Sequence, residues 1–214
     1  KYDDFNSGAW EMVVHDLAIL CGLNVPEARA INFSKLGTTF LVKRFDRNGK
    51  QRVHFASAMT MLGKSDGASA TDGSSYLEIV AFLKASGAAP QKDIQELWKR
   101  IVFSMVVSNT DDHFRNHGFI LSKKGWLLSP LYDVNPDIYG EFLSLNVDTN
   151  DSSIDFDLAI DAAPFYELDK KQATLLINQT KSVVKNNWQI LAQKYNINRA
   201  EIKRMEPAFK ECEM

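Results

Sequence analysis

The stretch that decides the fold is Ser108-Asn-Thr-Asp-Asp-His-Phe-Arg-Asn-His-Gly118, which is followed later by Leu131-Tyr-Asp-Val-Asn135. Within it, Asp111 stands five positions before Asn116, and Asp133 lies 17 positions after Asn116. Phosphoryl transfer requires a carboxylate that orients the attacking hydroxyl and oxygen ligands that hold Mg²⁺ against the phosphates. Kinases place a catalytic Asp five residues before a metal-binding Asn and return along a short hairpin to a second metal-binding Asp. The spacing therefore predicts a magnesium-dependent phosphoryl-transfer site.

Two other interpretations of these residues stay open at this point. The first is a capped turn after a helix, because Asn and Asp favour turns. The second is a transition-metal hydrolase site made of His113 and His117, spaced i, i+4, with Asp111 and Asp133. Phe114 occupies the place of the Glu that follows the first His in zinc proteases. His113 by itself is more typical of an imidazole that organises a loop beside a carboxylate.

Composition narrows the class of protein. The chain has 214 residues, a formal net charge of −2, 45% hydrophobic and 24% charged residues, which is typical of a globular protein and excludes a disordered or fibrous one. The near-neutral balance argues against direct nucleic-acid binding. Cys21 and Cys212 are the two cysteines, so neither a disulfide framework nor a cysteine zinc site is indicated. This low cysteine content is consistent with a protein of the reducing cytosol. No apolar run approaches the roughly 20 residues of a membrane helix.

The periodicity predicts an α+β fold with two unequal lobes. Residues 1–64 would form a partial small lobe, a polar loop would cover 65–73, and residues 74–214 would form a helical large lobe. Expected helices cover 11–21, 56–62, 75–85, 92–108, 156–162, 169–195 and 198–211. Expected strands cover 29–33, 38–45, a short segment around Val53, and a hairpin of 118–121 with 126–128.

The motifs resemble those of the HipA-like serine/threonine kinases. Thr110-Asp-Asp-His-Phe-Arg-Asn116 resembles the T-D-x-H-x-(K/R)-N motif of that family, and Ser129-Pro-Leu-Tyr-Asp133 resembles its P-x-Y-D motif. Val42-Lys-Arg-Phe-Asp-Arg47 is similar to the V-E-R-F-D-R strand and hinge. The segments 11–26 and 162–188 also resemble family segments. The resemblance implies a protein-kinase-like two-lobe fold with a truncated small lobe, and transfer of phosphate from Mg-ATP to serine or threonine.

The resemblance also implies roles for single residues. Asp111 would be the catalytic base, and Asn116 and Asp133 would hold Mg²⁺. The other implied positions would contact ATP or the lysine that binds its phosphates. His113, Arg115 and Tyr132 would line the phosphate side of the nucleotide. Lys43, Arg44 and Phe45 would form the hinge whose backbone contacts the adenine edge, Asp46 would lie near the ribose, and Glu11 would be the helix glutamate that pairs with the phosphate-binding lysine. Structural alternatives are a core-facing strand for Val42 and Phe45, a surface ion pair for Lys43 and Asp46, and an exposed helix-start acid for Glu11.

The chain departs from the family pattern in two places. The family hinge usually has Glu where this chain has Lys43, so a backbone contact to the nucleotide survives the change but a side-chain contact does not. The phosphate-binding lysine of the family lies on a strand ahead of the first helix, next to a glycine-rich loop. Lys1 does not fit that lysine, and the first residue is not Met, which is expected of a fragment. We therefore expect this polypeptide alone to bind ATP weakly and to transfer phosphate poorly. A second hypothesis is a nucleotide-binding or regulatory module with an incomplete kinase site.

The resemblance implies partners as well. It points to the toxin of a bacterial toxin–antitoxin module in the cytoplasm, with a protein substrate such as an aminoacyl-tRNA synthetase and a DNA-binding antitoxin protein. Residues 137–155 occupy the position of an activation segment. Phosphorylation there is one hypothesis, and loop solubility explains its hydroxyl residues equally well (Ser144, Thr149, Ser152, Ser153).

Overall fold

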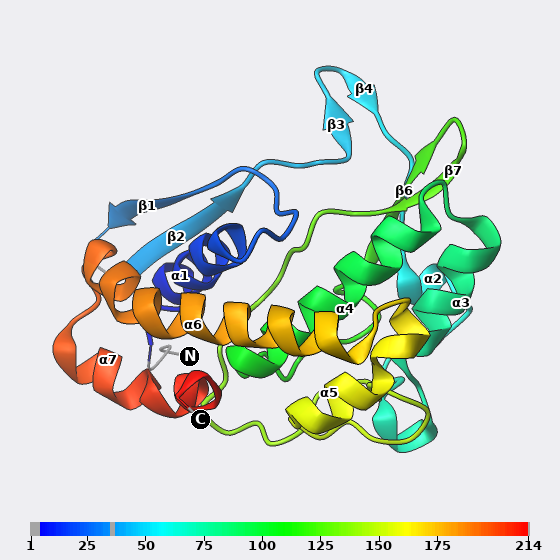
Figure 1. Ribbon diagram of the computed structural model, residues 1–214. Coiled ribbons are helices and arrows are strands. Elements are labelled where there is room, and N and C mark those ends of the chain that lie inside the picture. Colours follow the sequence, from blue (N-terminus) through cyan, green and yellow to red (C-terminus); the bar gives the residue numbers. More distant parts are fainter. Residues whose placement is uncertain (1–4, 35–36, 214) are drawn as a thin grey trace.

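The computed structural model describes residues 5–34 and 37–213 and confirms the mixed helical and sheet architecture (Figure 1). The helices are α1 (Ser7–Leu20), α2 (Ala58–Met61), α3 (Tyr76–Ser86), α4 (Pro90–Val106), α5 (Phe156–Ala162), α6 (Lys170–Lys194) and α7 (Arg199–Met205), with 3₁₀ turns η1 (Ala70–Asp72), η2 (Ala163–Tyr166) and η3 (Glu206–Cys212). The strands are β1 (Ala28–Ser34), β2 (Gly37–Val42), β3 (Arg47–Asn48), β4 (Gln51–Arg52), β5 (Phe55–Ser57), β6 (Gly118–Ser122) and β7 (Gly125–Leu128).

Helix α1 begins four residues earlier than its apolar periodicity predicts, because Asn6 ties its start to the neighbouring sheet. The side chain of Asn6 accepts a hydrogen bond from the Thr38 backbone at 2.9 Å and donates one to the Thr38 hydroxyl at 3.0 Å. Gly8 allows this close approach, since a Cβ there would lie 2.2 Å from the Thr38 carbonyl oxygen. At the other end Gly22 adopts φ +73° and ends the helix, as the sequence predicts.

Strands β1 and β2 form a two-stranded antiparallel sheet that packs on α1. The predicted strand 38–45 ends at Val42, and a separate small hairpin, β3 with β4, turns through Gly49 at φ +58°. Val53 lies between β4 and β5 and is not itself in a strand. The predicted helix 56–62 is shorter than expected because residues 55–57 pair with β6 in a three-stranded sheet, in the order β5-β6-β7.

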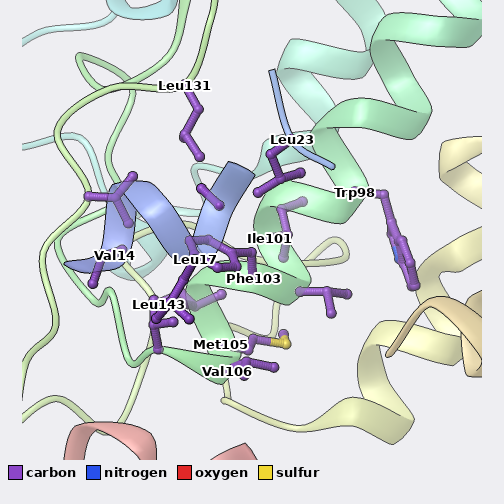
Figure 2. Packing of buried hydrophobic residues seen from close by; sticks show 14 of the residues in the cluster. Val14, Leu17, Leu23, Trp98, Ile101, Phe103, Met105, Val106, Leu131 and Leu143 are labelled. Carbon is purple, nitrogen blue, oxygen red and sulfur yellow. The ribbon is translucent and has the colours of Figure 1, made fainter. Parts of the chain in front are cut away.

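The hydrophobic core is continuous from α1 to η3. Figure 2 shows Leu17 of α1 beside Phe103 of α4, within one buried cluster. The long helix α6 packs against α1, α4 and α5. This arrangement makes α4 the element that carries the chain through the core to residue 107. The division into lobes of residues 1–64 and 74–214 stays a prediction.

The C-terminal helix is the main difference from the predicted pattern. The expected helix over 198–211 divides into α7 and the 3₁₀ turn η3, because Pro207 stands in the first turn of η3 and lacks the N–H that an α-helix would need there. Trp188 of α6 stacks on Phe209 of η3 at a centroid distance of 4.5 Å, which anchors this end to the core. Within residues 5–34 and 37–213, no helix has both the length and the apolar character needed to cross a membrane.

Candidate active site

The loop after α4 is shaped by a change of backbone direction at Ser108, which adopts φ +50°. Next to it the buried side chain of Asn109 accepts a hydrogen bond from the backbone N–H of Asn135 at 3.2 Å. The backbone N–H of Asp137 donates to the carbonyl of Ser108 at 3.0 Å. These bonds join the loop after α4 to the segment after β7, so residues distant in sequence come to lie side by side.

Asp111, Asn116 and Asp133 meet at this junction. The amide nitrogen of Asn116 donates to the carbonyl of Asp111 at 2.9 Å and lies 3.5 Å from the carbonyl of Asp133. The Asp111 side chain is 88% exposed, and Asp133, at φ +58°, is exposed as well. Because the amide nitrogen of Asn116 is the donor, its oxygen Oδ1 is the atom that can ligate a cation. One amide oxygen and one carboxylate suit Mg²⁺, which keeps several waters or phosphate oxygens as its remaining ligands.

A narrow cleft lies between α1, β2 and residues 131–134, and Glu11 and Asp133 both line it. Its free volume is about 20 Å³, which is on the order of one water molecule. Burial, together with the negative charge of Asp133, raises the pKa of Glu11 to about 7, against a smaller opposing effect of His15. The cleft therefore brings two carboxylates near each other, an arrangement that a cation would stabilise.

Tyr132 connects the predicted hinge to the predicted catalytic loop. Its ring lies 5.7 Å from the ring of Phe45 and 6.3 Å from that of Phe55. Its hydroxyl donates to the carbonyl of Arg115 at 2.6 Å. Gly118 makes this packing possible, because a Cβ there would lie 2.3 Å from the Phe55 ring. The structure thus places Phe45 and Tyr132 together, next to residues 115–118.

The polar side chains of the hinge segment bind each other and Glu27, which directly precedes β1. The carboxylate of Asp46 is nearly buried and accepts hydrogen bonds from Arg44 at 2.8 and 2.7 Å and from Arg47 at 2.7 Å. The hydrogen bond from Arg44 is the main cause that holds the pKa of Asp46 below its ordinary value. Lys43 forms an exposed ion pair with Glu27 at 2.6 Å, and its backbone N–H donates to the carbonyl of the same Glu27. These contacts direct the Lys43 side chain to Glu27, while Phe45 packs toward Tyr132.

His113 and Arg115 lie beside Asp111 but face a different cavity. Nε2 of His113 is 3.9 Å from Oδ1 of Asp111 and 3.3 Å from Nη2 of Arg115. Arg115 also forms an ion pair with Asp66. Together with residues 65–69 and Ser144, these side chains line a cavity of about 140 Å³. The charge of Arg115 is therefore directed at the polar loop 65–73, and the structure does not bring Arg115 into the cleft lined by Glu11 and Asp133.

Asp112 is the residue that sequence reasoning missed. It is buried beneath the loop, where Oδ1 lies 3.0 Å from Nε2 of His117 and Oδ2 accepts a hydrogen bond from the Tyr76 hydroxyl at 2.9 Å. The consecutive acids Asp111 and Asp112 were the available signal, but a sequence does not say which of two neighbours points inward. In the part of the chain that the structure describes, no three His, Cys, Asp or Glu side chains are grouped to hold a metal, so the hydrolase interpretation gains no support.

Comparison with known proteins adds an independent line of evidence. Residues 2–188 match the family model described as the HipA-like C-terminal domain. The chain is 30% identical over 135 residues to the putative kinase Y4mE of Sinorhizobium fredii, which covers 58% of this chain and 31% of that protein. It is 27% identical over 152 residues to the serine/threonine-protein kinase toxin HipA of Shewanella oneidensis, which covers 62% of this chain and 35% of that protein. The chain thus spans about a third of the length of these relatives.

Two solved structures have a similar fold. A structure of the Shewanella oneidensis toxin–antitoxin complex of HipA, HipB and operator DNA matches with a TM-score of 0.82 at 20% identity, covering 100% of this chain and 56% of that one. The Helicobacter pylori proinflammatory kinase CtkA matches with a TM-score of 0.60 at 13% identity, covering 99% and 89%. At these identities the likeness shows a common fold.

Proposed function

This chain belongs to the HipA-like C-terminal domain family, and from that premise we propose that it forms the catalytic core of a protein kinase that uses Mg-ATP to phosphorylate serine or threonine. The observation that carries the proposal is the position of Asn116, whose amide nitrogen lies 2.9 Å from the carbonyl of Asp111 and 3.5 Å from that of Asp133. The kinase names of the relatives support the same reaction class.

In this proposal Asp111, Asn116 and Asp133 have different roles. Asp111, an exposed side chain of the loop between α4 and β6, accepts the proton of the attacking hydroxyl and orients that hydroxyl. Oδ1 of Asn116 and the carboxylate of Asp133 hold Mg²⁺. When bound, the metal neutralises the charge that develops on the phosphate oxygens.

The nucleotide would occupy the cleft between α1, β2 and residues 131–134. Glu11 and Asp133 both line this cleft, and by resemblance Glu11 would pair with the phosphate-binding lysine. By resemblance, the backbone of residues 43–45 contacts the adenine edge, Asp46 lies near the ribose, and Tyr132 lies on the phosphate side of this cleft. His113 and Arg115 face the neighbouring cavity, so their implied phosphate contacts require the side chains to turn toward the cleft. Packing of Phe45 on Tyr132 supports a hinge close to the catalytic loop. The free volume of the cleft, about 20 Å³, is smaller than a nucleotide, so this proposal requires the cleft to widen when ATP binds.

The partners of the proposed kinase follow from its relatives. Because the matching Shewanella oneidensis structure is a complex of HipA with HipB and operator DNA, we propose a protein antitoxin as a partner that itself binds the DNA. The substrate would be a cytoplasmic protein, and an aminoacyl-tRNA synthetase is the first candidate. Activation-segment phosphorylation at Ser144, Thr149, Ser152 or Ser153 remains a hypothesis within this proposal.

The test uses the longest natural chain that contains these residues, incubated with labelled ATP, Mg²⁺ and a cell extract. We expect label on protein serine or threonine, and we expect Asp111→Ala to abolish it. Asp161→Ala is the matched control, because Asp161 is an exposed carboxylate on α5, outside the loop, that forms an ion pair with Lys170. If the unaltered, folded chain transfers no label, the kinase proposal is wrong and a nucleotide-binding or regulatory module is the better description.

A further inference from the structure

A buried pair of side chains, Asp112 and His117, supports the candidate active-site loop from the core side. Asp112 is 1% exposed and His117 is 0% exposed. Nε2 of His117 lies 3.0 Å from Oδ1 of Asp112, and neither ring nitrogen of His117 makes a well-aligned hydrogen bond within residues 5–34 and 37–213. The Asp112 carboxylate is therefore the polar group on which this buried imidazole depends.

The carboxylate of Asp112 is held from two helices as well. Tyr76 of α3 donates its hydroxyl to Oδ2 at 2.9 Å, and Ser104 of α4 donates to the same oxygen at 3.5 Å. Burial by itself would raise the pKa of Asp112, but His117, Tyr76 and Arg100 together hold it below its ordinary value. A charged, buried carboxylate with this many partners has one favourable position, because an unpaired charge in the core is strongly unfavourable.

Each member of the pair is the direct sequence neighbour of a residue in the proposed site. Asp111 precedes Asp112 and points outward, whereas Asp112 points into the core. Asn116 precedes His117, and its bond to the carbonyl of Asp111 closes the loop between the two anchored positions. We infer that Asp112 and His117 form a buried clamp that positions Asp111 and Asn116 for phosphoryl transfer, an inference that rests on the proposed kinase function.

Helix α4 extends the same support to the other half of the site. Arg100 is fully buried in α4, and its Nη2 donates to the carbonyl of Ser129 at 2.9 Å. Ser129 begins the segment that leads to Asp133. Through Ser104 and Arg100, α4 therefore contacts both the Asp112–His117 clamp and the start of the Asp133 segment. Asp112 and His117 act through Asp111 and Asn116, so they are positioning residues and do not need to contact the substrate.

The test compares variants in the longest natural chain that contains these residues. Asp112→Asn keeps an acceptor for the Tyr76 hydroxyl but removes the charge that faces His117. Asp112→Asn combined with His117→Gln replaces both members by amide side chains, which can hydrogen-bond to each other. Asp93→Asn is the matched control, because Asp93 is also a buried carboxylate but lies on α4, outside the loop. It accepts a hydrogen bond from the backbone N–H of Leu128 at 2.9 Å. The readouts are kcat, the KM for ATP, and amide hydrogen exchange of residues 109–118 compared with α6.

For Asp112→Asn we expect a decrease in kcat on the order of ten- to a hundredfold, as for a misplaced catalytic group. The KM for ATP should stay within about threefold, since Asp112 does not line the cleft. Exchange should become faster in residues 109–118 and not in α6. The double variant should regain about tenfold in kcat over Asp112→Asn, because the Gln amide can donate a hydrogen bond to the amide oxygen at position 112. Asp93→Asn should leave kcat within about twofold because Asp93 lies outside the clamp.

The inference is overturned if Asp112→Asn leaves kcat unchanged in folded protein, or if exchange rises equally in all helices. It is also overturned if the double variant is no better than the single one. Should the unaltered chain show no turnover, the proposed kinase function fails instead. In that event the local exchange of residues 109–118 still decides, without any kinetic measurement, whether the clamp holds the loop.

Discussion

Replacing Glu11 by Gln should stabilise the folded chain at alkaline pH and leave it unchanged at acidic pH. Burial and the charge of Asp133 raise the pKa of Glu11 from 4.5 to about 7 in the folded state. Below pH 4.5 the carboxyl is neutral in both states. As the pH rises from 4.5 to 7, the unfolded chain loses the proton first, so the contribution of Glu11 makes the folded state progressively less stable. Gln carries no charge and avoids this loss.

The size of the expected gain in stability follows from the difference between the pKa of Glu11 in the folded and unfolded states. A pKa change from 4.5 to about 7 corresponds to at most about 3 kcal/mol. Glu11 is partly exposed, so solvent screening reduces the expected gain to about 1–2 kcal/mol above pH 7. In a domain of about 200 residues this equals a rise in Tm of roughly 3–6 °C.

The assay is urea unfolding followed by tryptophan fluorescence at pH 5 and pH 8, because Trp10, Trp98 and Trp188 are buried reporters in the core. Glu141→Gln is the control, since Glu141 is an exposed loop carboxylate that does not line the cleft. An equal stability difference between the Glu11→Gln variant and the unaltered chain at both pH values would refute the reasoning. A loss of stability at pH 8 would refute it as well, because it would mean that the ionised Glu11 already has a favourable partner.

Three further predictions concern other contacts. Adding Mg²⁺ at pH 8 should narrow the difference in Tm between the Glu11→Gln variant and the unaltered chain, because a cation near Glu11 and Asp133 favours the ionised carboxylates. Calorimetry with and without Mg²⁺ measures these Tm values. An unchanged Tm difference would count against a cation in the cleft. Asp16→Asn should cost about 1 kcal/mol at pH 7. Burial would raise the pKa of Asp16, but the nearby His15 and the hydrogen bonds from Lys194 and Tyr195 outweigh burial and hold that pKa well below its usual range. The contribution of Asp16 is present above pH 3.8 and is lost as the pH falls further, so urea unfolding from pH 7 to pH 2 should show the stability difference between variant and unaltered chain shrinking. Gly118→Ala should destabilise the fold by about 1–3 kcal/mol, because its Cβ would overlap the Phe55 ring, and a Tm equal to that of the unaltered chain would mean that the ring moves freely.

Local patterns explain why most elements were predictable. The apolar stripe of α4, the glycine at the end of α1 and the hairpin of β6 and β7 each depend on residues close in sequence, and all three are present with ends shifted by a few residues. The elements that differ depend on distant partners. Residues 55–57 became a strand because β6 lies beside them, and α1 was extended by the bonds of Asn6 to Thr38.

The candidate site divides in the same way. The sequence by itself determined the residue types and spacing of Asp111, Asn116 and Asp133, because motif spacing is a property of the chain alone. Only the tertiary structure decided that Asn116 bonds to the carbonyl of Asp111 and lies close to that of Asp133, that Glu11 faces Asp133, and that Asp112 points into the core toward His117. Burial and the field of neighbouring charges arise from segments far apart in sequence, and they set which of two adjacent aspartates supports the loop and which one faces solvent.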